Sequence, residues 1–205
     1  MGEPAPPRPT VATSTTRVVA PRPPANLLDR PRVLDLIDAG VRERLTLVAA
    51  SPGSGKTLAL AAWVQSGRAP GAVGWLTLDR TDNDPAVLWA DLLDAIRSTG
   101  AVDGIVLLAH LAPATRLGEQ DVASILDALS TVTGHLVVVL DDVEKIVAPQ
   151  AMDIIGRLTT YPGLPIHLVL LTRTDPALPL HQLRPVGALT EIRTAELAFT
   201  RTEVD

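Results

Sequence analysis

The chain has 205 residues, of which 46% are hydrophobic, and these two figures suit one α/β domain with a sizeable core. Only 2% of the residues are aromatic, which argues against a surface that stacks the bases of single-stranded nucleic acid. The net charge of −5 argues against binding of DNA through its phosphates. The absence of cysteine excludes disulfides and thiolate metal sites. It also fits the reducing cytoplasm, where we expect the protein to be located.

No segment of the chain is expected to contact a membrane. The longest apolar run, residues 104–112 (GIVLLAHLA), is too short to span a bilayer and contains His110. The N-terminus lacks the apolar segment of a secretory signal. Residues 1–25 are instead dense in proline, which predicts an extended or disordered leader before a single folded domain at residues 26–205.

The folded domain is expected to begin with a helix within residues 26–40 (NLLDRPRVLDLIDAG). Asp29 is placed to cap this helix, Pro31 suits its first turn, and Gly40 can end it.

Apolar runs that suit buried strands alternate with helical patterns along the rest of the chain. Strands are expected at residues 45–50, 72–79, 135–142, 166–173 and 189–194. Helices are expected from Lys56 to Gln65, from Pro85 with Asp84 as its cap, and around Val122, Ile125, Leu126 and Leu129. Continuous apolar strands that alternate with amphipathic helices predict an α/β fold in three layers, with a mainly parallel five-stranded sheet covered on both faces.

The stretch between the first expected strand and the next helix, ASPGSGKT at residues 50–57, has the features of a phosphate-binding loop. A strand that ends in a turn of small residues and opens a helix points several backbone N–H groups and the positive end of the helix dipole at one spot. Gly53 and Gly55 can adopt the positive φ angles that such a turn needs, and they let phosphate oxygens approach the backbone around Ser54.

The residues that follow the turn complete this Walker A pattern. Lys56 would reach the β- and γ-phosphates of a nucleotide, and the Thr57 hydroxyl would bind Mg²⁺. We include Leu58, the next residue of the helix, among the nucleotide-binding residues. Ala50 takes the place of the first glycine of the pattern, which is tolerable if this residue keeps strand geometry. The alternative is a structural turn that carries a solvated lysine.

A hydrophobic strand that ends in two carboxylates, LVVVLDD at residues 136–142, has the Walker B pattern. Asp141 can hold Mg²⁺, usually through a water, and Asp142 can orient the water that attacks the γ-phosphate. The alternative is a pair of solvated turn carboxylates. Two such motifs at the ends of apolar strands, in the right order, favour a nucleotide site.

Two further polar segments allow more than one interpretation. Arg173 follows the fourth expected strand, where a cation can neutralise the γ-phosphate, but it could equally pair with a carboxylate such as Asp175. Residues 79–85 (DRTDNDP) are rich in acids, but they lack the glycine and the final glutamate of a calcium loop, so we expect turns and helix caps there.

Five linked segments of the chain together resemble one family. They are LLDRPRVL, ASPGSGKT, LTLDRTDNDP, LDDVEKI and LTRTDPALPL. Over residues 17–205 the sequence resembles the NTPase domain of MalT-like regulators, which are large LuxR-type bacterial transcription factors of the STAND class of P-loop NTPases. The resemblance implies an ASCE-type P-loop fold. Its strands, numbered along the chain, would lie in the order 5-1-4-3-2, with the fourth strand between the two Walker strands.

The resemblance also implies a function and a set of site residues. The domain would bind ATP or ADP with Mg²⁺ as a regulatory switch, would hydrolyse ATP slowly at most, and is consistent with ATP-dependent self-association. Thr57 and Asp141 would be the metal ligands, and Arg30 would lie near the adenine. Asp142 and Arg173 would serve catalysis, Arg173 as a sensor of the γ-phosphate.

Besides Ala50, two further features depart from the family pattern. Glu144 stands where the family often has a histidine after the aspartate pair. The helical, sensor and DNA-binding domains of the family are missing after residue 205, so we expect a fragment or a truncated product that does not itself contact DNA.

Two other functions remain as alternatives. A free-standing P-loop enzyme, such as a small-molecule or nucleotide kinase, would need an acceptor pocket and a lid that carries arginines. The only candidate insertion, residues 99–120, has Arg116 as its single arginine. A structural module with an inactive site is the other alternative, and the intact Lys56, Thr57 and Asp141 argue against it.

Overall fold

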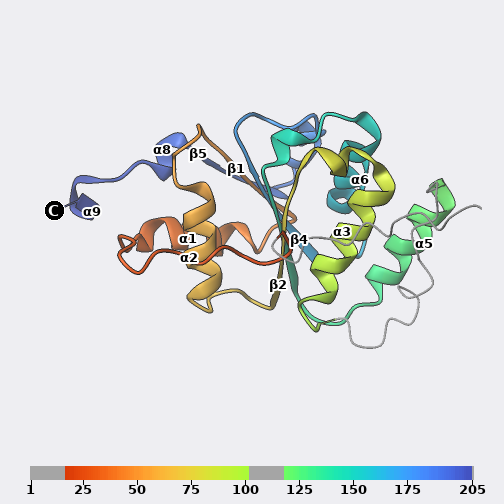
Figure 1. Ribbon diagram of the computed structural model, residues 1–205, viewed down its shortest axis with the longest axis horizontal. Helices are drawn as coiled ribbons and strands as arrows, with labels where there is room; N and C mark the ends of the chain where they lie inside the picture. Colours follow the sequence, from red (N-terminus) through yellow and green to blue (C-terminus); the bar gives the residue numbers. More distant parts are fainter. Residues whose placement is uncertain (1–16, 102–117, 205) are drawn as a thin grey trace, which may run out of the picture.

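A five-stranded parallel sheet forms the centre of the protein, in a computed structural model that describes residues 17–101 and 118–204 (Figure 1). Its strands are β1 (Leu45–Ala49), β2 (Ala72–Thr77), β3 (Leu136–Asp141), β4 (Ile166–Thr172) and β5 (Leu189–Arg193). They lie in the order β2-β3-β4-β1-β5, and every neighbouring pair is parallel. This is the predicted order 5-1-4-3-2 read from the other edge. The prediction that β4 separates the two Walker strands, β1 and β3, is confirmed.

Helices cover both faces of the sheet. The longer ones are α1 (Pro31–Gly40), α2 (Lys56–Gln65), α3 (Pro85–Arg97), α5 (Glu119–Ser130) and α6 (Pro149–Thr160). The short ones are α7 (Leu180–Leu183), α8 (Thr194–Leu197), α9 (Arg201–Val204) and the 3₁₀ turns η1 (Arg80–Asn83) and η2 (Val143–Lys145). Helices α1 and α2 lie on one face of the sheet, and α3, α5 and α6 lie on the other (Figure 1). The predicted three-layer α/β fold is confirmed.

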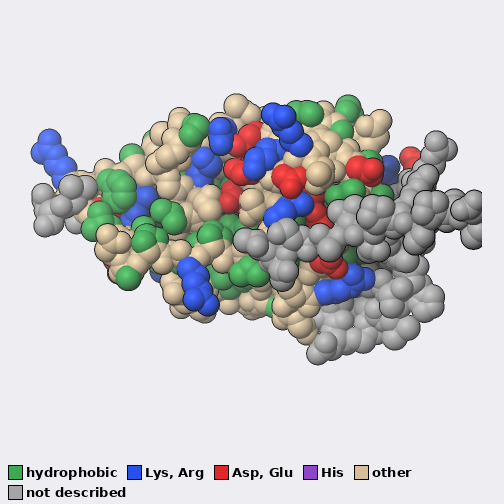
Figure 2. Space-filling model, viewed as in Figure 1, with side chains coloured by type: hydrophobic (Ala, Val, Ile, Leu, Met, Phe, Trp, Pro, Cys, Tyr) green, Lys and Arg blue, Asp and Glu red, His purple; other side chains and the backbone are tan. Residues whose placement is uncertain are grey.

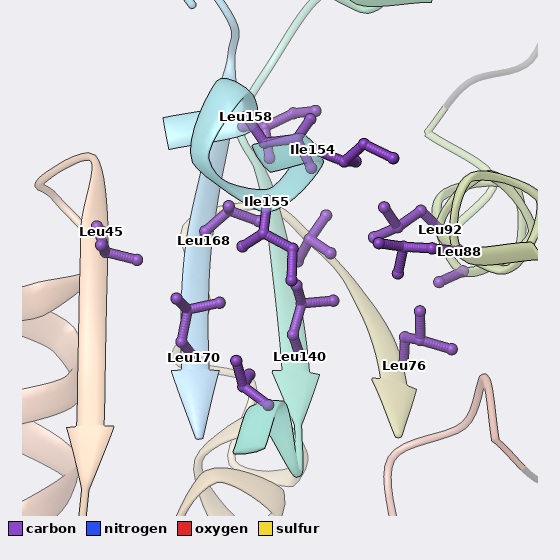
Figure 3. Close-up of a cluster of buried hydrophobic side chains, with 14 of the residues drawn as sticks. Leu45, Leu76, Leu88, Leu92, Leu140, Ile154, Ile155, Leu158, Leu168 and Leu170 are labelled. Atoms are coloured by element: carbon purple, nitrogen blue, oxygen red, sulfur yellow. The ribbon is translucent and has the colours of Figure 1, made fainter. Parts of the chain in front are cut away.

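Each face of the sheet has its own hydrophobic core. The three central strands β1, β3 and β4 are buried along their whole length, which explains their unbroken apolar sequences. On the face of α3 and α6, leucine and isoleucine side chains of these helices pack against leucines of the strands (Figure 3). On the opposite face, Trp63 of α2 and Trp75 of β2 are buried with residues of α1. The loops that follow the carboxyl ends of these strands are therefore attached to a well-packed sheet.

The first helix differs from its prediction in one respect. Asp29 does not cap α1: the residue at the N-cap position is Arg30, and no side chain makes a capping hydrogen bond there. Pro31 occupies the first turn and Gly40 is the last residue of the helix, as expected. At Gly40 a Cβ atom would lie 2.6 Å from Thr46 Oγ1, so close packing against β1 requires glycine at this position.

Packed structure extends further toward the N-terminus than predicted: Arg17, which lies within the expected leader, already packs against the sheet. The backbone N–H of Thr77 donates a hydrogen bond to the Arg17 carbonyl at 2.8 Å, and Arg17 Nε donates to the Thr77 carbonyl at 3.0 Å. The last part of the proline-rich leader thus pairs with the end of β2. The rest of the leader, residues 1–16, lies outside the described residues.

The acid-rich segment 79–85 forms turns and caps, as expected. Asp79 caps η1 by accepting a hydrogen bond from the Thr81 N–H at 2.7 Å, and Asp84 caps α3 by accepting one from the Ala86 N–H at 2.9 Å. The apolar run 104–112 lies outside the described residues. Within the described part of the chain, no helix combines the length and hydrophobicity needed to cross a bilayer.

Candidate functional site

The loop between β1 and α2 has the backbone geometry of a phosphate nest. Gly53 and Gly55 have φ angles of 78° and 85°, which side chains other than glycine rarely tolerate. The Ala50 N–H donates to the Thr172 carbonyl at 3.2 Å, so Ala50 continues the pairing of β1 with β4. Alanine therefore fits where the Walker A pattern has its first glycine. The N-terminus of the ten-residue helix α2 opens onto this loop.

Two polar groups inside the loop suit an anionic ligand. Lys56 Nζ donates hydrogen bonds to the carbonyl oxygens of Ala50 at 2.7 Å and of Ser51 at 3.1 Å. The Ser54 hydroxyl is buried and has no hydrogen-bond partner among the residues that the structure describes. A phosphate group would satisfy this hydroxyl and the N–H groups of the turn, and its charge would be balanced by the ammonium group. The residues present therefore fit the phosphates of a nucleotide.

The two Walker motifs touch at the carboxyl edge of the sheet. Thr57 Oγ1 donates a hydrogen bond to Asp141, at 3.0 Å from Oδ2 and 3.3 Å from Oδ1. Burial raises the pKa of the Asp141 carboxyl, the hydrogen bond from Thr57 lowers it, and the charge of Asp142 raises it further. A cation beside Asp141 would favour the ionised carboxylate and so oppose the effect of burial.

A hydroxyl and a carboxylate at this distance are hard oxygen ligands, as Mg²⁺ prefers. Within residues 17–101 and 118–204, no group of three His, Cys, Asp or Glu side chains could hold a metal ion by itself. Thr57 and Asp141 would therefore share Mg²⁺ with phosphate oxygens and water, which is its usual mode of binding at phosphate sites.

The two residues predicted to serve catalysis are held by ion pairs. Asp142 adopts a left-handed backbone conformation, with φ 60°, and its carboxylate lies 2.6 Å from Lys145 Nζ. Arg173 Nε lies 2.6 Å from Glu144 Oε1, and the Arg173 side chain is half exposed. The predicted alternative partner of Arg173, Asp175, pairs with Arg193 instead. The catalytic roles of Asp142 and Arg173 remain predictions.

The remaining predicted site residues line one cavity of about 710 Å³ beside the loop. These residues are Arg30, Gly53, Ser54, Gly55 and Leu58. The segment 23–29 before α1, together with apolar side chains of α1 and α2, forms most of the rest of the wall. A cavity of this size suits a nucleoside next to a phosphate nest.

Arg30 is fixed in the wall of this cavity. Its side chain is 8% exposed, and its Nη2 donates to the Leu197 carbonyl at 2.6 Å. Burial lowers the pKa of Arg30, while the charge of Glu203 raises it. The sequence analysis did not identify Phe199, which also lines the cavity and lies against Arg30, with 4.2 Å between Arg30 Cζ and the ring centroid.

A second cavity, of about 730 Å³, lies between α6 and the segment after β4. Its wall includes Glu144 but none of the residues 50–58. Because no glycine-rich turn or helix N-terminus of the phosphate loop opens into it, the first cavity is the better candidate for a nucleotide.

Two proteins, described next, match most of this chain in sequence, although no family model matches it. The serine/threonine-protein kinase PknK of Mycobacterium tuberculosis is 30% identical over 200 residues, which make up 95% of this chain and 18% of that protein. The HTH-type transcriptional regulator MalT of Serratia proteamaculans is 28% identical over 186 residues, or 87% of this chain and 20% of that protein. The chain thus spans about a fifth of the length of the curated relatives it matches.

Solved structures support the fold. Cdc6p from Pyrobaculum aerophilum superposes with a TM-score of 0.55 and 17% identity, and the match covers 87% of this chain and 50% of that one. A Walker-type ATPase of Pyrococcus abyssi gives a TM-score of 0.54 and 16% identity, covering 89% of this chain and 57% of that one. The chain is similar in sequence to a segment of PknK and of MalT, and it has the α/β fold of P-loop NTPases. The predicted resemblance and fold class are thereby confirmed. At these sequence identities, the solved structures support the fold alone.

Proposed function

We infer that this MalT-like domain is an ATP/ADP-binding regulatory switch of a bacterial transcription regulator, with slow ATP hydrolysis at most. The observation that carries the proposal is the contact between Thr57 and Asp141, because it joins the phosphate loop to the end of β3 at one point. The name of the relative MalT, a transcriptional regulator, supports the regulatory part of the proposal.

Each residue of the site has a defined task in this proposal. The nest at Gly53 and Gly55 and the Lys56 ammonium bind the phosphates, and Thr57 and Asp141 hold Mg²⁺. The bound Mg-ATP supplies an activated γ-phosphoryl group that water can attack. Lys56 gives up its hydrogen bonds to the carbonyls of the loop when it binds phosphate oxygens, so little else must rearrange.

The ion pairs around the site favour a switch over an efficient enzyme. Rapid phosphoryl transfer needs cations positioned around the γ-phosphate and a residue that orients the attacking water. Arg173 is instead paired with Glu144, and Asp142 is paired with Lys145. Both pairs would have to open before these residues could contact the γ-phosphate.

A kinase function has less support than the switch. PknK is named a kinase, but MalT is named a transcriptional regulator, and both match nearly the same segment of this chain. The shared segment therefore does not require kinase activity. Arg116, the single arginine of the insertion that might form a kinase lid, lies outside the described residues.

The proposal also includes a cytoplasmic location, membership of the STAND class and ATP-dependent self-association. Sedimentation velocity of the chain with ADP and with ATP tests the self-association. A change in sedimentation coefficient with ATP alone supports it, and identical profiles with the two nucleotides contradict it.

Hydrolysis of ATP by the 205-residue chain is expected to be slow. The turnover rate should be well below about one per second, which is the lower end of the range for ordinary kinases. The physical reason is the pairing of Arg173 and Asp142 with other residues. Phosphate release in the presence of Mg-ATP measures the rate, and Lys56→Ala serves as the control for contaminating ATPases. Sustained turnover of one per second or more, absent from the variant, would contradict the switch and favour the enzyme.

The chain is not expected to bind DNA specifically. It carries 18 Lys and Arg residues against 23 Asp and Glu residues. On the face shown in Figure 2, basic side chains are interspersed with acidic ones and do not gather into one patch. A gel-shift assay with a labelled promoter library checks this prediction. A shifted band that resists nonspecific competitor DNA would show that it is wrong.

A further inference from the structure

The only phenylalanine of the chain, Phe199, is exposed in an unusual place. This residue is 53% exposed, whereas the three tryptophans are buried in the two cores. It lines the cavity beside the phosphate loop, although it lies more than 140 positions from that loop in the sequence. Exposing a large apolar ring to water is unfavourable, and a ring at the wall of a cavity often marks a ligand contact.

Arg30 holds this ring next to the phosphate loop. Its guanidinium lies over the Phe199 ring, 4.2 Å from the centroid, in the geometry of a cation–π contact. Its Nη1 lies 3.9 Å from the position that a Cβ atom would occupy on Gly55. Arg30 therefore lies between the loop and the ring, and its hydrogen bond to the Leu197 carbonyl fixes its position.

The segment that carries Phe199 is anchored by a second arginine. Arg32 donates hydrogen bonds to the carbonyls of Glu196 at 2.7 Å and of Ala198 at 2.8 Å. Glu203 lies 3.6 Å from Arg32 and 4.0 Å from Arg30. The ring is thus held in place before any ligand arrives, which lowers the entropy cost of binding.

We propose that Phe199 is a base-contacting residue: the flat face of a nucleobase packs against the Phe199–Arg30 pair while the phosphates bind at residues 53–57. This inference rests on the proposed function, because it assumes that the phosphate loop binds a nucleotide. Apolar side chains of Leu28, Val33 and Leu34 line the same cavity and suit the remaining surface of a base. The segment 194–204, which includes α8 and α9, is then part of the nucleotide site.

The test compares a ligand that has a base with one that has none. ATP and inorganic tripolyphosphate, each with Mg²⁺, are titrated by calorimetry into the wild-type chain, Phe199→Ala and Phe199→Leu. Val186→Ala is the matched control, since Val186 is an exposed apolar side chain, 74% exposed, that does not line the cavity. Thermal melts of each variant establish that it is folded.

We expect Phe199→Ala to bind ATP about tenfold to a hundredfold more weakly, as for the loss of a base–aromatic stack, with tripolyphosphate affinity unchanged. Phe199→Leu keeps apolar bulk but has no flat ring. It should likewise bind ATP more weakly, with its affinity for tripolyphosphate unchanged. Unchanged ATP affinity in Phe199→Ala, or an equal loss for both ligands, would overturn the inference while leaving the proposed function intact. If the wild-type chain binds tripolyphosphate no worse than ATP, the base contributes nothing and the inference is also overturned. If it binds neither ligand, the proposed function itself fails.

Discussion

Replacing Lys56 with alanine is expected to remove most of the thermal stabilisation that Mg-ATP gives to the chain. A ligand that binds only the folded state adds about 2.7 kcal/mol at a hundredfold excess over its dissociation constant, which corresponds to about 5–10 °C for a domain of this size. Loss of a charge-assisted hydrogen bond, about 1.5–3 kcal/mol, weakens binding tenfold to a hundredfold and reduces the shift accordingly. Without nucleotide the variant should remain folded, because within the described part of the chain Lys56 Nζ donates hydrogen bonds only to two carbonyls of its own loop.

Thermal melts of both proteins with and without Mg-ATP measure this effect. Arg42→Ala is the matched control, because it removes an exposed cation that lies near the amino ends of β3 and β4, at the end of the sheet opposite to the phosphate loop. The control should keep the full shift. Equal shifts in wild type and Lys56→Ala would mean that Lys56 is a solvated residue on a structural turn.

Replacing Arg17 with alanine is expected to destabilise the folded chain by about 3 kcal/mol, as when one partner is removed from a buried ion pair. The Arg17 guanidinium pairs with Asp82, with Asp91 at 3.0 Å and with Asp79 at 3.2 Å. The Asp82 side chain is fully buried and that of Asp91 is nearly so. Without Arg17 these two carboxylates would lose this counter-charge inside the protein.

The cost of this substitution should depend on pH. Burial raises the pKa of Asp82 to about 6, although the charge of Arg17 lowers it. Because the folded state holds this proton more tightly than the unfolded state does, the contribution of Asp82 to stability falls as the pH rises from about 4 to about 6. Removing Arg17 raises the pKa of Asp82 further, so the variant should lose more stability at about pH 7.5 than at about pH 5.

Urea unfolding at these two pH values tests the prediction. Arg22→Ala is the control, since Arg22 is an exposed arginine of the same leader segment. It should have little effect at either pH. A penalty for Arg17→Ala that is the same at both pH values, or no larger than that of the control, would show that the acidic cluster does not depend on Arg17.

The strands and helices could be predicted because their determinants are local. Five apolar runs predicted the five strands, and the turn at residues 51–55 predicted that α2 starts at Lys56. The strand order came from the family resemblance, since no local pattern specifies which strands are neighbours. Where capping depended on fine detail, the prediction was wrong, as for Asp29.

Several contacts that the sequence analysis missed join distant segments. Arg17 lies in a leader that looks disordered by composition, yet its carboxylate partners are 62 to 74 positions away. The placement of Arg30 near the adenine stays a prediction, and its hydrogen bond to the Leu197 carbonyl, which was not predicted, spans 167 positions. Glu144 was noted only as a departure from the family pattern, and its pairing with Arg173 becomes visible when β3 and β4 lie side by side. No periodicity or motif encodes such side-chain pairs.

Equilibrium binding of labelled ATP to the wild-type chain, with Mg²⁺ and with EDTA, tests the nucleotide site most directly. The contact between Thr57 and Asp141 predicts saturable binding of one ATP per chain, weakened about tenfold or more when EDTA removes the metal, as expected for the loss of about 1.4 kcal/mol or more. ADP should compete for the same site. No saturable binding of either nucleotide, with or without Mg²⁺, would contradict the account.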